Sequence, residues 1–239
     1  MYVFKWKRKL GILNLEERVI PQSLIYSNDL NKDMDRTFPT NKFFTPEIKL
    51  KIKNILLNYI EVNSAMDYFQ GLCYITYTLY YVFSKDKNTA EMNTFYALHK
   101  IIAPIRPCIP LDEDDIGPPS FISNLSKVII LKISEEKIDL AEKLNELDIV
   151  KIFVVQGMPA LFANWYDLDS VIHLWDYIID TTAVKMFDNV IEFFTAYFLS
   201  YEKIIMNFQL EKILQLLQSR TNLGKILQQL KYKKYYKNI

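Results

Sequence analysis

Apolar residues in this chain recur every three or four positions over long stretches that no proline interrupts. That spacing lines one face of an α-helix, whereas a half-buried strand alternates apolar and polar residues. Alternating runs bounded by turn residues are scarce, and only five of the 239 residues are glycine. A sheet-rich fold is hard to build from such a sequence. The pattern therefore predicts an all-α protein.

The clearest helical segment begins at Thr45. Its Thr-Pro-Glu start offers a capping hydroxyl, a proline at the first helical position and an acid in the first turn. The lysines that follow fall on the opposite side from the apolar residues. The expected buried face of this helix carries Ile48, Ile52, Ile55, Leu56 and Tyr59.

Three further segments have the same helical character. One is expected to open at Ser134, with Ile138, Ala141 and Leu144 on its buried face. The other two are 184–206 and 210–230, and neither contains a proline that would break a helix.

One clear interruption divides these helical segments. The proline-dense stretch 104–110 is followed by an acidic run at 112–115 and by Gly117-Pro-Pro. We interpret it as the joint between an N-terminal lobe of about 1–110 and a C-terminal lobe of about 111–230. The basic and aromatic tail 231–239 is interpreted as a solvated helix end, with contact to phosphates or a membrane surface as the alternative.

Composition narrows the classes of partner. Lys plus Arg number 29 against 28 acids, and the net charge of +1 gives no bulk attraction to nucleic acid or to an anionic membrane. The first residues lack the apolar core of a secretory signal. The uncharged stretch 68–83 is shorter than the about 20 apolar residues that a bilayer span requires. We expect a cytoplasmic protein that has no transmembrane segment and binds no nucleic acid.

The residues that usually carry metal or nucleotide chemistry have no motif here. His99 and His173 are far apart and outside any HExxH pattern, so no metal site is expected. Cys73 and Cys108 lack CxxC spacing, which favours reduced, buried, structural thiols. The acidic run 112–115 lacks the glycine and spaced ligands of a calcium loop. The absence of GxxxxGK[ST] and GxGxxG motifs predicts that the chain has no nucleotide or cofactor of its own.

Two short segments differ from ordinary core. In the first, Asp33 and Arg36 lie three residues apart and would share one face of a short helix that stops at Pro39. In the second, Gln70 and Gly71 enter a long apolar segment. Considered alone, the first is most often a surface ion pair, and the second a cap or turn.

Together and in this order, these segments resemble the TBC domain family of Rab GTPase-activating proteins. The family's arginine-finger motif IxxDxxR, followed by Thr and Pro, is similar to residues 30–39, with leucine at the first place. Its glutamine-finger motif YxQG is matched in full by residues 68–71. The two motifs stand in the right order, and a single expected helix separates them. Their conjunction is more specific than either motif alone.

The likeness extends over most of the chain. Trp6 with the following Leu-Gly resembles the family's opening segment, and Trp175-Asp176 resembles its late tryptophan-aspartate motif. Tryptophans at helix junctions are expected to anchor the core. The chain departs from the family pattern at Val3, where the family has arginine, and at Gly157-Met158, where it has Trp-Phe. The resemblance implies a single, two-lobed, all-helical TBC domain over 1–239.

The resemblance also implies a function and a set of site residues. The chain would accelerate GTP hydrolysis by a GTP-bound Rab-type small GTPase, which brings Mg²⁺ and GTP with it. Arg36 would stabilise charge on the transferred phosphoryl group, and Gln70 would position the attacking water. Asp33 would orient Arg36 or brace the helix that carries it, while Tyr68 and Gly71 would support the loop of Gln70.

Two other functions compete with this one. A non-catalytic GTPase-binding adaptor could keep the TBC fold, but the presence of both finger residues favours catalysis. In a helical scaffold without a GTPase partner, Arg36 and Gln70 would match the motifs by accident. A helical solenoid of that kind would need a 20–50-residue repeat, and none is visible. The expected location is the cytoplasm, with peripheral association to Rab-bearing endomembranes through the Rab or the basic tail.

Overall fold

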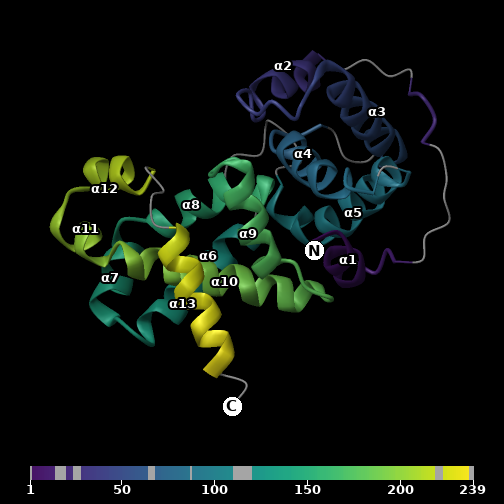
Figure 1. Ribbon diagram of the computed structural model, residues 1–239. Coiled ribbons are helices and arrows are strands. Elements are labelled where there is room, and N and C mark those ends of the chain that lie inside the picture. The colour runs from purple at the N-terminus through teal and green to yellow at the C-terminus, as the bar shows by residue number, and fades with distance from the viewer. Residues whose placement is uncertain are drawn as a thin grey trace. The chain divides into compact units, whose positions relative to one another are not determined.

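A computed structural model describes residues 2–13, 20–23, 28–63, 68–86, 88–109, 120–218 and 223–236, the last six of them by their backbone only (Figure 1). These residues form thirteen α-helices and two short 3-10 helices, and none of them forms a strand. The all-α prediction is confirmed. Within the described ranges, no helix is both long and apolar enough to cross a membrane.

The chain divides into two compact units. The first contains 1–117 and 157–181, and the second contains 118–156 and 182–239. The first change of unit lies close to the joint expected near residue 110. The segment 157–181, expected in the C-terminal lobe, instead folds with the N-terminal residues. The acidic run 112–115 and Gly117-Pro-Pro lie outside the described residues.

The helix α4 lies at the centre of the first unit. It contacts α1, α2, α3, α5, α9 and η2, and Figure 1 shows α3, α4 and α5 close together. Nearly every residue of α4 is buried, which explains why its sequence is apolar on all sides. The helices of this unit are α1 (Tyr2–Lys9), α2 (Asn28–Arg36), α3 (Pro46–Val62), α4 (Leu72–Phe83), α5 (Ala90–Ile105), η1 (Arg106–Cys108), η2 (Met158–Ala160) and α9 (Leu168–Ile178).

The prediction for α3 is confirmed except at Ile48, which is only half-buried. The hydroxyl of its N-cap, Thr45, accepts a hydrogen bond from the backbone N–H of Ile48 at 3.4 Å. Pro46 occupies the first turn. The expected apolar face is buried at Ile52, Ile55, Leu56 and Tyr59.

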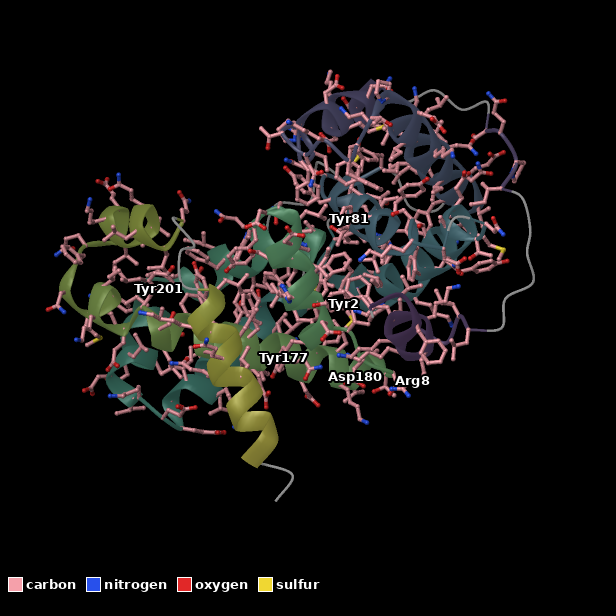
Figure 2. The ribbon with its side chains drawn as sticks, viewed as in Figure 1. Tyr2, Arg8, Tyr81, Tyr177, Asp180 and Tyr201 are labelled. Atoms are coloured by element: carbon pink, nitrogen blue, oxygen red, sulfur yellow. The ribbon has the colours of Figure 1, made fainter. Side chains whose placement is uncertain are left out.

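Two tryptophans join α1 to α9 inside the first unit. The rings of Trp6 and Trp175 are both fully buried, with 6.0 Å between their centroids. Around them, Lys5 pairs with Asp176 at 2.6 Å, and the hydroxyl of Tyr2 lies 3.0 Å from Nδ1 of His173. Tyr2 is labelled in Figure 2. These contacts explain why the segment containing α9 folds with the N-terminal residues, and they confirm that both tryptophans anchor the core.

At Gly157, where the chain departs from the family pattern, neighbouring rings leave no room for a side chain. A Cβ at this position would meet ring atoms of Phe162 at 2.8 Å and of Trp165 at 2.9 Å. The two rings themselves pack edge-to-face, with 5.2 Å between centroids. Aromatic volume next to position 157 is therefore supplied by residues that come later in the chain.

The second unit is built around α10. This helix packs on α6 and α13, and α6 packs on α7. Tyr201, labelled in Figure 2, follows the end of α10 and lies 5.1 Å from the ring of Tyr197. The helices of this unit are α6 (Ser120–Ser134), α7 (Ile138–Glu146), α8 (Ile149–Gly157), α10 (Ala183–Ser200), α11 (Glu202–Asn207), α12 (Leu210–Leu217) and α13 (Leu223–Tyr236).

Two predictions for this unit are wrong in detail. Ser134 ends α6 rather than opening a helix, and α7 begins at Ile138, which is 58% exposed. The buried face of α7 consists of Leu140, Ala141 and Leu144, and Ile138 is not part of it.

The prediction of unbroken helices fails for both later segments. Tyr201 separates α10 from α11 within 184–206. Within 210–230, α12 ends at Leu217 and α13 begins at Leu223.

Candidate functional site

An ion pair closes the C-terminal end of α2. The side chain of Asp33 is only 8% exposed, whereas that of Arg36 is 55% exposed. Their spacing of three residues places them on one face of the helix, and Nη2 of Arg36 pairs with Oδ1 of Asp33. A guanidinium carries five N–H donors, so Arg36 has further N–H groups that can bind a partner while it pairs with Asp33. The prediction that these two residues share a face is confirmed.

The second oxygen of the same carboxylate is bound to the other motif. The hydroxyl of Tyr68 donates a hydrogen bond to Oδ2 of Asp33, across 35 positions of sequence. Burial is the main cause that raises the pKa of Tyr68 above its ordinary value, and the nearby Cys73 adds to it. The phenol therefore keeps its proton at neutral pH. One buried carboxylate links the arginine of α2 to the first residue of the YxQG motif.

A thiol also reaches this network. Sγ of Cys73, in the first turn of α4, lies 3.4 Å from the hydroxyl oxygen of Tyr68. Burial raises the pKa of Cys73 to about 12. Cys73 and Cys108 are both free and buried, as the sequence predicts. The contact between Cys73 and Tyr68 was not predicted, because no motif marks a thiol at this position.

Two hydroxyl groups fix the last turn of α2. Thr37 donates to the backbone carbonyl of Asp33 at 2.6 Å, and Tyr77 of α4 donates to that of Met34 at 3.3 Å. The helix ends at Arg36, and Phe38 then takes a positive φ of 44°. The residue before a proline is disfavoured in the helical region, which agrees with a stop just ahead of Pro39.

A tight turn presents Gln70 ahead of α4. Gln70 is exposed, and within the ranges the structure describes its side chain makes no hydrogen bond. Gly71, next to it, has a φ of +122°, a conformation that side chains rarely adopt. A Cβ here would also lie 2.9 Å from the carbonyl oxygen of Pro159. Glycine is therefore required at this position by its backbone and by its neighbour.

A hollow of about 460 Å³ adjoins the end of α2. It is bounded by residues 38–41, by Tyr74 of α4 and by residues 164–168, the last of which begins α9. Phe38 packs edge-on against Tyr74, with 5.3 Å between ring centroids. Nearby, Tyr81 packs edge-on against Phe43 at 4.8 Å and extends the same aromatic cluster (Figure 2).

The structure brings three of the five predicted site residues into direct contact. Asp33, Arg36 and Tyr68 form one network, and Gln70 and Gly71 follow Tyr68 in the chain. Among the described residues no hydrogen bond joins Arg36 to Gln70, so their common reach to one phosphate stays a prediction. No group of three His, Cys, Asp or Glu side chains among the described residues could hold a metal ion.

Comparisons with known proteins agree with this arrangement. The model of the Rab-GTPase-TBC domain family matches residues 7–206. TBC1 domain family member 13 of Homo sapiens is 28% identical over 133 residues, which are 52% of this chain and 32% of that protein. The same protein of Mus musculus gives the same identity and coverage. The chain thus spans about a third of the length of these relatives.

A solved structure supports the fold. The crystal structure of the Ypt/Rab-GAP domain of Gyp1p superimposes with a TM-score of 0.64 at 14% identity, over 98% of this chain and 80% of that one. The family match covers well over half of the 239 residues. The chain therefore belongs to the Rab-GTPase-TBC domain family.

Proposed function

We propose that this chain is a GTPase-activating protein for a Rab-type small GTPase in its GTP-bound state. The observation that carries the proposal is the carboxylate of Asp33, which binds both Arg36 and Tyr68. It ties an exposed guanidinium to the loop that carries an exposed carboxamide. Membership of the family supports the proposal. The chain would act in the cytoplasm, at endomembranes that carry its Rab.

Arg36 would act on the transferred phosphoryl group. That group passes through a loose transition state with negative charge over its oxygens, and a guanidinium in a water-poor interface stabilises this charge. The side chain is 55% exposed and so is available to a partner surface. Lysine would replace it poorly, because the planar fork reaches more than one oxygen and stays charged when desolvated.

Gln70 would position the attacking water. A carboxamide accepts a hydrogen bond from water through its oxygen and donates one to phosphate through its nitrogen. The side chain is exposed and is not engaged by other described residues. Mg²⁺ and GTP would come with the GTPase, and the chain would need no cofactor of its own.

The network beneath the two groups would hold them ready for the reaction. Catalytic side chains work best when packing and hydrogen bonds fix them before the partner arrives. Asp33 is buried and bonded on both oxygens, so it has little freedom to move. Asp33 and Tyr68 would thus be positioning residues, and Gly71 would set the backbone of the turn.

A panel of GTP-loaded Rab proteins, assayed for phosphate release with and without this chain, tests the proposal. The expected result is strong acceleration for at least one Rab. A non-catalytic adaptor would instead bind a Rab without speeding hydrolysis. Binding that leaves every release rate at its intrinsic value would contradict the proposal.

A further inference from the structure

Tyr68 contacts two acceptors but has one proton to give. Its hydroxyl oxygen lies near Oδ2 of Asp33 and 3.4 Å from Sγ of Cys73. The carboxylate is by far the stronger acceptor, so it takes the phenol proton. The contact with sulfur is then satisfied only if the thiol donates its own proton to the phenol oxygen.

We propose that Cys73 is a positioning residue for Arg36. Its thiol donates to the oxygen of Tyr68, the hydroxyl of Tyr68 donates to Asp33, and Asp33 holds the guanidinium. This inference rests on the proposed function, since it concerns the readiness of Arg36 for catalysis.

The thiol of Cys73 is a weak hydrogen-bond donor, but it is buried, and this strengthens its effect on Tyr68. Cys73 is 0% exposed, so bulk water does not reach the thiol itself. Hydrogen bonds in a chain polarise one another, and a donor to the phenol oxygen makes the phenol a better donor to the carboxylate. The raised pKa of the Cys73 thiol, about 12, means that it keeps its proton in the physiological range.

A second buried thiol provides a matched control. Cys108 in η1 is also free and 0% exposed, and burial raises the pKa of its thiol to about 12. In contrast to Cys73, it has no hydrogen bond to any described residue. Removing the Cys108 thiol therefore measures the loss of a buried sulfur atom without any change to the network.

The test is a set of single-turnover hydrolysis assays on the best Rab of the panel. Cys73→Ala should lower kcat/KM by about two- to tenfold, the size of one lost buried hydrogen bond, and mainly through kcat. Cys73→Ser, which keeps a donor, should stay within about twofold of the unchanged chain, as should Cys108→Ala. In a Tyr68→Phe background, Cys73→Ala should cause no further loss, because the acceptor is gone.

The outcomes separate this inference from the proposed function. No stimulation of any Rab by the unchanged chain would contradict the proposed function. Stimulation by the unchanged chain with an equal rate for Cys73→Ala, or an equal loss in the Tyr68→Phe background, would overturn the role of Cys73 alone. Circular dichroism checks folding, and Cys73→Val, which also lacks a donor, replaces Cys73→Ala if that variant does not fold.

Discussion

The hydroxyl of Tyr68 donates a hydrogen bond to the carboxylate of Asp33, and that carboxylate also pairs with Arg36. Two motifs that lie more than thirty residues apart are thus joined through one buried side chain. Considered alone, the sequence suggests that Asp33 and Arg36 form an ion pair on the surface. In the structure they do form an ion pair, but Asp33 is buried. Such an acid cannot be removed without leaving partners unsatisfied.

Replacing Asp33 with alanine should affect both stability and activity. The change leaves the Tyr68 hydroxyl with only the weak sulfur acceptor of Cys73, at a cost of about 1–3 kcal/mol in the free energy of unfolding. Stimulated hydrolysis should fall, but less than for Arg36→Ala, because Asp33 acts through another residue. Urea denaturation and single-turnover assays measure the two effects.

Asp29 offers the control for this change. It lies on the same helix and pairs with Lys32 at 3.4 Å, but its side chain is 79% exposed. An exposed pair contributes about 0–1 kcal/mol, so Asp29→Ala should leave both measurements nearly unchanged. Equal effects of the two substitutions would contradict the role given to Asp33.

The sequence predicts those elements whose signals are local. The cap at Thr45, the proline after it and the spacing of the apolar residues all act within α3, and the helix forms as expected. The candidate residues Asp33, Arg36 and Tyr68 are likewise found from short motifs. What the motifs do not contain is the bond between Asp33 and Tyr68, which depends on how α2 packs against α4.

Tertiary packing also explains the helix break that was missed. The segment 184–206 has no glycine or proline at the point where α10 ends. At Tyr201 the backbone N–H turns to the carbonyls of Phe198 and Leu199. The helix that follows, α11, packs against α7, where Glu202 pairs with Lys137 at 3.2 Å. A break made by contacts with distant residues leaves no mark in the local sequence.

Gly71→Ala should destabilise the first unit and weaken stimulation. The backbone at this position has a φ of +122°, and the new Cβ would lie 2.9 Å from the carbonyl oxygen of Pro159. Backbone strain of this kind costs about 1–3 kcal/mol, and the close contact adds to it. Thermal denaturation measures the stability, and phosphate release measures the effect on the turn of Gln70.

The substitution Gly11→Ala is a control that separates backbone strain from the close contact with Pro159. Gly11 also has a positive φ, +69°, but nothing lies within 4 Å of the position its Cβ would take. Gly11→Ala should therefore cost only the backbone term, about 1–2 kcal/mol. If Gly11→Ala destabilises the protein as much as Gly71→Ala, the contact with Pro159 has no part in the effect.

Trp175→Phe should destabilise the protein more than Trp6→Phe. Both rings are fully buried, but Nε1 of Trp175 donates to the carbonyl of Leu161 at 2.8 Å, whereas Nε1 of Trp6 has no hydrogen-bond partner in the described ranges. Both changes lose ring volume, and the first also leaves a buried carbonyl unsatisfied. The difference in unfolding free energy should be about 1–3 kcal/mol. Equal losses in urea denaturation would show that the hydrogen bond contributes nothing.

Arg36→Ala should abolish stimulated hydrolysis while the domain stays folded. An arginine finger is worth about 10³ to 10⁵ in rate, and the buried carboxylate of Asp33 keeps the hydrogen bond from Tyr68 when the guanidinium is removed. Arg36→Lys should lose nearly as much, because lysine lacks the planar fork. Phosphate release and circular dichroism are measured on the same samples. Full activity of Arg36→Ala on the best Rab would refute its assignment.

The role of Gln70 distinguishes this mechanism from one in which the GTPase positions its own water. If Gln70 positions the water, Gln70→Ala should cripple stimulation of an unmodified Rab. Arg36 and Gln70 act on one transition state, so the double variant should be little worse than Arg36→Ala alone.

The most direct measurement is single-turnover hydrolysis by a Rab whose own switch glutamine is changed to alanine. It is assayed beside the unmodified Rab with the unchanged chain, Arg36→Ala, Gln70→Ala and the double variant. The unchanged chain should still stimulate the altered Rab substantially, and Gln70→Ala should stimulate neither Rab. No stimulation of the altered Rab, together with normal activity of Gln70→Ala on the unmodified one, would contradict the two-finger mechanism.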